Sequence, residues 1–534
     1  MSEQPALAVE NLHVSFGPRH TPVEVLRGVT FSVQPGECVA LVGESGAGKS
    51  VLARTLIGLA GEGGSSARIR ADRLDIAGTD ARTFSQRQWR RLRGSQVGLV
   101  LQDALGSLDP LRTIGAEVGE TLLVQRPRPA RAERRARILD ALRQAGLPDA
   151  EIRAAQRSGE LSGGMRQRAL IASAIVGEPA LLLLDEPTTA LDAGVAAEVL
   201  DLLARLRDAG TAMLLVTHDL GAVARISDRV VVLREGAIVE QGHTAQVLTA
   251  PTHPYTASLL AAVPRGPKRA RPIEAGPAVD IQEPVTPALE AVHLTRSYPL
   301  PGGGHLTAVT DLSLRVLPAR VLGVVGESGS GKSTLARLLL AAEQPDAGDV
   351  FLNGAPWSSA SERERRVRRR QIRLIPQDPL ASFDPRLTAR TILRDAATLV
   401  GSATSPQELL AAVHLDPEVL DRRARTLSGG QRQRLAIARA LAANPDVLVC
   451  DEPVSALDVT IAAEILDLLE ELQASRALTI VFISHDLAVV RRVCDDVVVM
   501  SDGRIVESGP VEQVWSAPQH PVTRALLAAA PALP

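Results

Sequence analysis

The sequence LVGESGAGKS at residues 41–50 decides the fold. It predicts a buried strand, a glycine-rich loop and the first turn of a helix, in the pattern GxxxxGKS. Successive backbone N–H groups of such a loop point inward, and together with the helix N-terminus they bind phosphate oxygens. Glycines are needed there because a Cβ would keep the backbone away from the nucleotide. The pattern assigns Lys49 to the β- and γ-phosphates and Ser50 to Mg²⁺.

The same pattern returns as GESGSGKST at residues 326–334. A single match could be a glycine-rich turn before an ordinary helix, but the repetition favours two nucleotide-binding loops. We therefore predict nucleotide contacts along both loops and a magnesium ligand in each. The predicted contacts are Gly43, Glu44, Ser45, Gly46, Ala47, Gly48, Lys49, Ser50 and Val51 in the first loop, and Gly326, Glu327, Ser328, Gly329, Ser330, Gly331, Lys332, Ser333 and Thr334 in the second, with Ser50 and Ser333 as Mg²⁺ ligands.

Composition limits the class of protein. The chain has 534 residues, enough for two large domains or three to four of ordinary size. A formal net charge of −2 and an aromatic content of 2% argue against a general nucleic-acid binder. The N-terminal sequence does not resemble a signal peptide, and no apolar run approaches the length of a membrane span. Three scattered cysteines without a CxxC pair favour buried hydrophobic side chains in a reducing compartment.

The chain is one unit written twice. The separation between matching residues is 283 at Lys49 and Lys332, but 266 at Gly164 and Gly430. The first copy is therefore longer between the P-loop and the LSGG stretch. An invariant frame with an insert of variable length is typical of a core with an accessory subdomain.

The LSGG stretches at 161–164 and 427–430 predict a second anion-binding helix terminus in each copy. A serine stands at the N-cap position and two glycines follow it before a helix. The predicted nucleotide contacts are Ser162, Gly163, Gly164, Ser428, Gly429 and Gly430.

Carboxylate pairs end the apolar runs LLLLDE and VLVCDE, which are typical of central parallel strands. At the C-terminal ends of these strands, Asp185 and Asp451 would hold Mg²⁺ through water. Glu186 and Glu452 would orient and polarise the attacking water.

Histidines end a further strand in each copy. His218 and His485 could hydrogen-bond the γ-phosphate and sense its loss. A lone histidine would more often be structural, but its recurrence at nearly the same distance from the glutamate favours the catalytic role.

Two further pairs are candidates. Gln102 and Gln377 end strands and could bridge Mg²⁺, water and a moving subdomain. Phe16 and Tyr298 could stack on adenine, and the alternative for each is a half-buried strand aromatic. The arginine clusters on the helices beyond are interpreted as solvated faces, with an anionic lipid surface as the alternative.

All these motifs, in this order, resemble those of the ATP-binding cassette (ABC) family. GESG at both P-loops, the LDP and FDP triplets after the glutamines, and the HPYT tail at 253–256 resemble the dipeptide/oligopeptide/nickel importer group. The resemblance implies an α/β fold with two P-loop (RecA-like) nucleotide-binding domains in tandem, each with an antiparallel β-subdomain and a helical subdomain. We expect the first domain at residues 1–262 with a helical insert at about 103–160, a Pro/Arg-rich linker at 263–287, and the second domain at 288–534 with an insert at about 378–426.

The resemblance also implies the function. The chain would bind ATP and Mg²⁺, hydrolyse ATP and energise uptake of di/oligopeptides or a related small solute. Its partners would be two permease subunits and an extracytoplasmic solute-binding protein, with no nucleic acid, and it would lie peripherally on the cytoplasmic face of the cell membrane. The two halves would close head to tail as a pseudo-dimer, so that Lys49 shares its nucleotide with residues 428–430, and Asp192 and Asp458 would lie beside the nucleotides.

Three departures and one alternative accompany the resemblance. Met165 replaces the usual glutamine of the signature, with little loss expected because Ser162 and the backbone bind the phosphate. Val522 replaces the usual tyrosine in the second tail. Residues 264–290 contain no cysteine, so we predict no iron–sulfur cluster. The alternative function is a soluble twin-cassette ATPase acting on ribosomes or in DNA repair.

Overall fold

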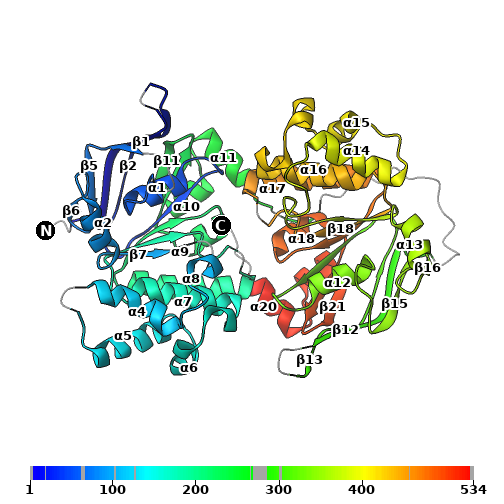
Figure 1. Ribbon diagram of the computed structural model, residues 1–534, viewed down its shortest axis with the longest axis horizontal. Coiled ribbons are helices and arrows are strands. Elements are labelled where there is room, and N and C mark those ends of the chain that lie inside the picture. Colours follow the sequence, from blue (N-terminus) through cyan, green and yellow to red (C-terminus); the bar gives the residue numbers. More distant parts are fainter. Residues whose placement is uncertain are drawn as a thin grey trace. The chain divides into compact units, whose positions relative to one another are not determined.

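The computed structural model describes residues 4–529, apart from 19, 62–66, 102–103, 126–127, 190, 265, 269–284, 300–302 and 456. The chain forms two compact units, and the main boundary between them falls at Val263 and Pro264. Each unit combines a six-stranded sheet, a smaller antiparallel sheet and a set of helices (Figure 1). Most of the predicted linker, and Gln102, lie outside the described residues.

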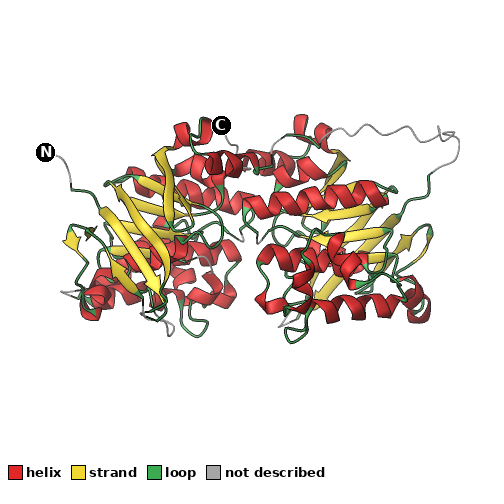
Figure 2. Cartoon of the chain, turned by 90° about the horizontal axis from the view of Figure 1, so that it is seen from above, coloured by secondary structure: helices red, strands yellow, loops and turns green. Residues whose placement is uncertain are grey.

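The six-stranded sheet of the first unit runs in the order β11-β10-β3-β9-β8-β7, and only β11 is antiparallel to its neighbour. Alternate residues of β8 pack into different cores: Leu181 and Leu183 into one, Leu182 and Leu184 into the other. The continuous apolar run is therefore needed because both faces of this sheet are covered. Figure 2 shows helices and strands beside each other in each unit. The strands are β3 (Cys38–Val42), β7 (Val97–Val100), β8 (Leu181–Asp185), β9 (Ala212–Val216), β10 (Arg229–Arg234) and β11 (Ala237–His243).

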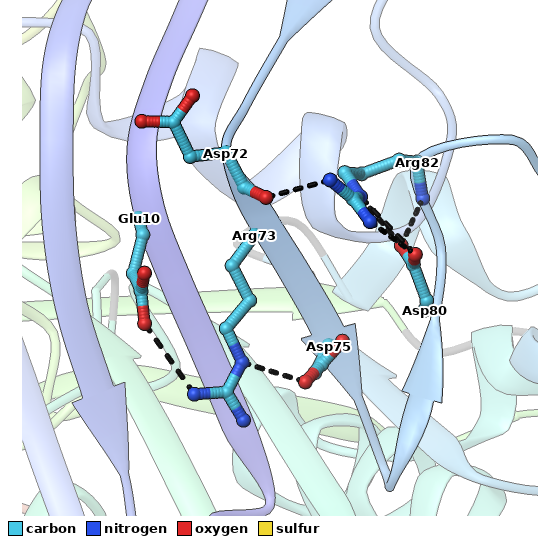
Figure 3. A network of polar contacts seen from close by, with 6 residues as sticks. All are labelled: Glu10, Asp72, Arg73, Asp75, Asp80 and Arg82. Carbon is cyan, nitrogen blue, oxygen red and sulfur yellow. Dashed lines mark hydrogen bonds and ion pairs between the residues drawn. The ribbon is translucent and has the colours of Figure 1, made fainter.

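The antiparallel sheet of the first unit contains β1 (Leu7–Phe16), β2 (Val23–Val33), β4 (Arg68–Arg70), β5 (Arg73–Ile76) and β6 (Thr79–Asp80). Arginines pair with carboxylates on its solvent-facing surface (Figure 3). Arg73 lies between Asp75 and Glu10, at 2.7 and 3.4 Å. Arg82 pairs with Asp80 at 2.7 Å and holds the pKa of that carboxyl at about 2. Such exposed pairs contribute little to stability.

The helices of the first unit divide into two groups. The first group accompanies the six-stranded sheet and comprises α1 (Lys49–Leu56), α2 (Gln86–Arg93), α8 (Ala193–Asp208), α9 (Leu220–Ile226), α10 (Thr244–Thr249) and α11 (Pro254–Ala261). The second group starts in the helical insert and ends with the LSGG helix. It comprises α3 (Ala104–Ser107), α4 (Ile114–Val124), α5 (Arg131–Gln144), α6 (Ala150–Ala155), the 3₁₀ helix Ser158–Glu160 and α7 (Gly163–Ile175). The 14-residue α5, which packs on α4 and α7, is longer than any helix at the matching place of the second copy.

The second unit repeats this architecture with sheet orders β17-β18-β19-β14-β20-β21 and β13-β12-β15-β16. Its strands are β12 (Leu289–Pro299), β13 (His305–Val316), β14 (Val321–Gly326), β15 (Ala347–Leu352), β16 (Ala355–Pro356), β17 (Ile372–Ile375), β18 (Val447–Asp451), β19 (Thr479–Ile483), β20 (Asp496–Ser501) and β21 (Arg504–Pro510). Its helices are α12 (Lys332–Leu339), α13 (Glu362–Arg368), α14 (Ala389–Val400), α15 (Pro406–Ala411), the 3₁₀ helices Pro417–Asp421 and Ala424–Thr426, α16 (Gly429–Leu441), α17 (Val459–Arg476), α18 (Leu487–Val493), α19 (Val511–Ser516) and α20 (Pro521–Ala529).

A short segment after Val263 packs on the second unit. Lys268 Nζ lies 2.9 Å from Asp495 Oδ1, and the Lys268 N–H donates to the Arg491 carbonyl at 3.1 Å. In the first unit, the matching aspartate, Asp228, has Arg207 at 3.6 Å instead. The residue that matches Arg207 is Gln473, so Lys268 supplies the cation that the second copy lacks.

The cysteines and the membrane-span prediction concern the whole chain. All three cysteines are free and buried, as the sequence suggested, and burial raises the pKa of the Cys38 thiol to about 12. Of the helices in the described ranges, none is both long enough and apolar enough to cross a membrane.

Candidate functional site

The first P-loop connects the end of β3 to the start of α1. Gly48, just before the helix, has a φ of 105°, and Gly43 has a φ of 152° with Leu233 O only 2.2 Å from where a Cβ would stand. Both positions therefore require glycine. Lys49 is 8% exposed, and its Nζ donates to the carbonyls of Gly43 and Glu44 at 2.6 and 3.0 Å. The loop thus holds its lysine ready for a phosphate.

The second P-loop has the same geometry. Lys332 is also 8% exposed and donates to the carbonyls of Gly326 and Glu327 at 2.7 and 2.8 Å. Burial lowers the pKa of this lysine. Nearby carboxylates oppose the shift, and the largest opposing effect comes from Glu452. A phosphate would restore a full counter-charge to the ammonium group.

Each carboxylate pair ends a buried strand beside a histidine. His218 Nδ1 lies 2.9 Å from Glu186 Oε1, and His485 Nδ1 lies 3.1 Å from Glu452 Oε1. Burial alone would raise the pKa of both glutamates, but the histidine hydrogen bonds and charges outweigh it and lower both values. The same hydrogen bond raises the pKa of His485. The glutamates are therefore ionised and able to accept a proton at neutral pH.

The backbone at these glutamates is strained. Glu186 has a φ of 50° and Glu452 a φ of 47°, in the left-handed region that non-glycine residues seldom adopt. Such a conformation costs about 1–3 kcal/mol and persists at functional sites where the surroundings impose it. Here the N–H of each glutamate donates to the neighbouring strand, at Val216 O and Ile483 O, at 2.8 and 3.0 Å.

The aspartates before these glutamates have the opposite electrostatics. Burial raises the pKa of Asp185 and of Asp451, and the adjacent glutamate raises each further. Two neighbouring carboxylates at the end of a buried strand favour a bound cation, and Mg²⁺ typically takes one or two carboxylates with phosphate and water as its other ligands. This donor set fits Mg²⁺.

Gln377 contacts the glutamate of its own unit. Its Nε2 donates to Glu452 Oε2 at 2.8 Å, so the amide and His485 hold the two oxygens of one carboxylate. In the first unit, Thr189 Oγ1 donates to Glu186 Oε2 at 3.0 Å. The threonine contact could not be predicted from a motif, because only the turn after the strand brings it there.

The LSGG helices begin as predicted, with one difference. Ser162 and Ser428 both cap their helices, accepting from the N–H of Met165 and Gln431 at 3.3 and 3.2 Å. The Gln431 side chain also accepts from the Ser428 N–H at 3.1 Å and completes a capping box, which methionine cannot do. The substitution at Met165 therefore costs one hydrogen bond at the helix terminus.

The last glycine of each signature is required by packing. A Cβ on Gly164 would lie 2.5 Å from Val195 Cγ1, and one on Gly430 would lie 2.6 Å from Ile461 Cγ2. In each case the neighbour belongs to the helix that follows the carboxylate pair, α8 or α17.

Comparisons with known proteins decide the family. The ABC transporter model matches residues 26–189 and 309–455, and the model for the oligopeptide/dipeptide transporter C-terminal region matches 239–284 and 506–534. The chain is 39% identical to the glutathione import ATP-binding protein GsiA of Escherichia coli (strain K12), covering 98% of this chain and 89% of that protein. It is also 39% identical to the peptidoglycan transport ATP-binding protein YejF of Agrobacterium fabrum, covering 99% and 96%.

The chain belongs to the ABC transporter family. It is an ATP-binding subunit of an importer of the oligopeptide/dipeptide type, and an ATPase that couples hydrolysis to transport. The predicted fold class, the tandem repeat of cassettes and the ATPase activity are thereby confirmed. An archaeal ribosome recycling factor, aABCE1, solved in complex with the ribosomal stalk protein aP1, is 21% identical with a TM-score of 0.59, covering 91% of this chain and 88% of that one. At that identity the likeness shows the fold alone.

The aromatic candidates of the ABC cassettes lie at strand ends. Phe16 is half-buried and packs on the core of its unit. Tyr298 has the Arg296 guanidinium 5.1 Å from its ring centroid, and its hydroxyl lies 2.5 Å from Glu343. Asp192 and Asp458 are half-buried before α8 and α17. Adenine stacking and a place for these aspartates beside the nucleotide remain predictions.

One contact to the first P-loop was missed. The Glu44 N–H donates to the hydroxyl oxygen of Tyr255 at 3.0 Å, across 211 residues of sequence. The available signal was the HPYT tail, which the sequence linked to a family and not to a nucleotide site.

Proposed function

We propose that each cassette of this ABC ATPase binds one Mg²⁺–ATP and that hydrolysis at both sites energises uptake of a peptide or peptide-like solute. The observation that carries the proposal is the pairing of a half-buried glutamate with a histidine in both units, at 2.9 and 3.1 Å. Neither unit has lost a catalytic group, so both sites are competent.

The residues have distinct roles at each site. Lys49 and Lys332, with the P-loop N–H groups, bind the β- and γ-phosphates. Asp185 with Ser50, and Asp451 with Ser333, would hold Mg²⁺, together with the glutamines Gln102 and Gln377. The metal supplies charge neutralisation between the phosphate groups.

The proton of the attacking water passes to Glu186 or Glu452 as the water oxygen bonds to the γ-phosphorus and the bond to the bridging oxygen breaks. Each histidine contacts its glutamate through Nδ1, and its other ring nitrogen, Nε2, would hydrogen-bond the γ-phosphate. His218 and His485 would thus report the state of the site.

The membrane partners follow from the family. An importer ATPase needs permease subunits, and we propose two, with an extracytoplasmic solute-binding protein that delivers the solute. The chain would then lie at the cytoplasmic face of the cell membrane, held by the permeases. The solute is a di- or oligopeptide or a small peptide such as glutathione, because the C-terminal regions match the oligopeptide/dipeptide model and the relatives carry glutathione or peptidoglycan import in their names.

The test is co-purification followed by titration. The tagged chain carrying Glu186→Gln and Glu452→Gln would be extracted from membranes with Mg²⁺–ATP, and the unmodified chain without nucleotide would be the control. Two multi-span proteins enriched with the trapped form support the proposal. Glutathione and dipeptides would then be titrated onto the solute-binding protein encoded or captured with them. Enrichment of ribosomal or DNA-repair proteins in place of permeases would overturn the proposal that the chain works with permease subunits.

A further inference from the structure

The tail helices α11 and α20 are attached to their units in the same way. Glu240 accepts from the His253 N–H at 3.1 Å, and the matching Glu507 accepts from the His520 N–H at 3.0 Å. The residue two positions beyond each histidine is therefore at the same place in both units. In the first unit that residue is Tyr255, and in the second it is Val522.

Tyr255 is buried between β3, α9 and the tail. It is 6% exposed and packs in the core that contains Val42 and Leu220. Its hydroxyl oxygen accepts from the Glu44 N–H at 3.0 Å, inside the first P-loop. The second tail has the same apolar packing role for Val522 but no hydroxyl to offer its P-loop.

The Tyr255 contact completes the support of one peptide group. The Glu44 N–H belongs to the same peptide unit as the Gly43 carbonyl, which accepts from Lys49 Nζ at 2.6 Å. In a trans peptide the N–H and the carbonyl point in opposite directions. The plane is therefore fixed from both sides, by the tyrosine on one and the P-loop lysine on the other.

A second difference between the units accompanies the first. The Arg234 guanidinium lies 4.9 Å from the centroid of the Tyr255 ring, at the end of β10. At the matching end of β20 the second unit has Ser501. The arginine and the tyrosine contact each other in the first unit, and both are absent from the matching positions of the second unit. We therefore treat them as one interacting pair.

We propose that Tyr255 is a positioning residue for the first nucleotide site. Through the Glu44 N–H it fixes the peptide whose carbonyl holds Lys49, and Arg234 holds the ring in place. The first loop therefore has a support on the Glu44 N–H that Val522 does not give the second loop, although the lysine contacts of the two loops are the same. The two sites then differ in nucleotide affinity, with the first site favoured by its tail. This inference rests on the proposed roles of Lys49 and Lys332.

The test measures each P-loop separately in the full chain. The probe is Mg²⁺–8-azido-ADP, which lacks the γ-phosphate that the signature of the other cassette is expected to contact. After photolabelling and digestion, mass spectrometry quantifies the labelled peptides of each cassette. The variants are Tyr255→Phe, which removes only the hydroxyl, and Ser258→Ala, a matched control whose hydroxyl contacts the Tyr255 carbonyl at 2.8 Å within the same helix.

Tyr255→Phe should raise the half-saturating probe concentration at the first site by about two- to tenfold, the effect of one neutral hydrogen bond. The second site and both sites of Ser258→Ala should be unchanged. A chain carrying Val522→Tyr and Ser501→Arg should gain affinity at the second site, which a merely structural role of the tyrosine would not produce.

An unchanged first site in Tyr255→Phe, or equal shifts at both sites, would overturn the inference while leaving the nucleotide sites standing. Loss of label at both loops of the unmodified chain would overturn the sites themselves, and the inference with them.

Discussion

Two serines of the second cassette make the same N-cap contact on different helices. Replacing each by alanine can therefore distinguish an effect on stability from an effect on catalysis. Ser428 begins the signature helix α16 and Ser405 begins α15. The N–H three residues on donates to the serine Oγ at 3.2 Å in both cases. Each serine also has a capping box, through Gln431 or Glu408. Replacing either by alanine should therefore cost about 1 kcal/mol of stability.

For a cassette of this size, about 1 kcal/mol corresponds to a fall of about 2–4 °C in melting temperature. The two variants should fall by similar amounts in thermal unfolding without nucleotide. Only Ser428→Ala should also lose ATPase activity, because its hydroxyl is expected to contact the γ-phosphate of a nucleotide. A hydrogen bond to a charged group is worth about 1.5–3 kcal/mol, so the loss should be about 10- to 100-fold at that site.

The two serine variants can refute a role of the Ser428 hydroxyl in catalysis. Equal ATPase losses in Ser428→Ala and Ser405→Ala would show that activity follows stability alone. Unchanged ATPase in Ser428→Ala, with the expected fall in melting temperature, would remove the hydroxyl from the catalytic site.

Three further predictions follow from individual contacts. Met165→Gln should restore the capping box of α7, which is worth about 0.5 kcal/mol, and so raise the melting temperature by about 1–2 °C without changing ATPase activity. The control Met165→Leu should leave the melting temperature and the ATPase activity unchanged. A fall of both in Met165→Gln would contradict the assignment. Lys268→Met should remove the ion pair to Asp495 and speed hydrogen exchange at the amide of residue 268, which donates to Arg491 O at 3.1 Å; unchanged exchange would show that the segment is held by other contacts. The pairing with Glu452 raises the pKa of His485, so its stabilising effect is fully present below the ordinary histidine pKa and is lost as pH rises through the raised value. The difference in melting temperature between the unmodified chain and His485→Ala should therefore shrink as pH rises from 6 to 9, and a difference that grows would refute the pairing.

Much of the chemistry could be predicted because it is written twice. Repetition favoured a functional role over a structural one for the histidines and the LSGG stretches. The structure brings His218 and His485 next to Glu186 and Glu452, as the sequence suggested, and the nucleotide contacts of the LSGG stretches remain predictions. The buried strands were predictable because a sheet covered on both faces needs the continuous apolar runs of β8 and β18.

The contacts that the sequence did not predict depend on tertiary register. Tyr255 reaches Glu44 only because α11 packs beside β3, and no local pattern encodes a contact across 211 residues. The left-handed backbone of Glu186 and Glu452 was also invisible, since glutamate has no preference for that conformation and the neighbouring strands impose it. Likewise, the excess length of the first insert was evident, but not that part of it forms the 14-residue α5.

Glu186 and Glu452 would catalyse hydrolysis in two complete sites. The most direct measurement is equilibrium binding and single-turnover hydrolysis of ATP by the Glu186→Gln, Glu452→Gln chain. The matched control is Glu235→Gln with Asp502→Asn, exposed turn residues whose φ values of 49° and 47° match the strain at the catalytic positions. Two ATP should bind per chain in both proteins, and the hydrolysis rate should be lowered by about 10²–10⁴-fold only in the Glu186→Gln, Glu452→Gln chain. Hydrolysis at the control rate, or a single bound ATP, would contradict this prediction.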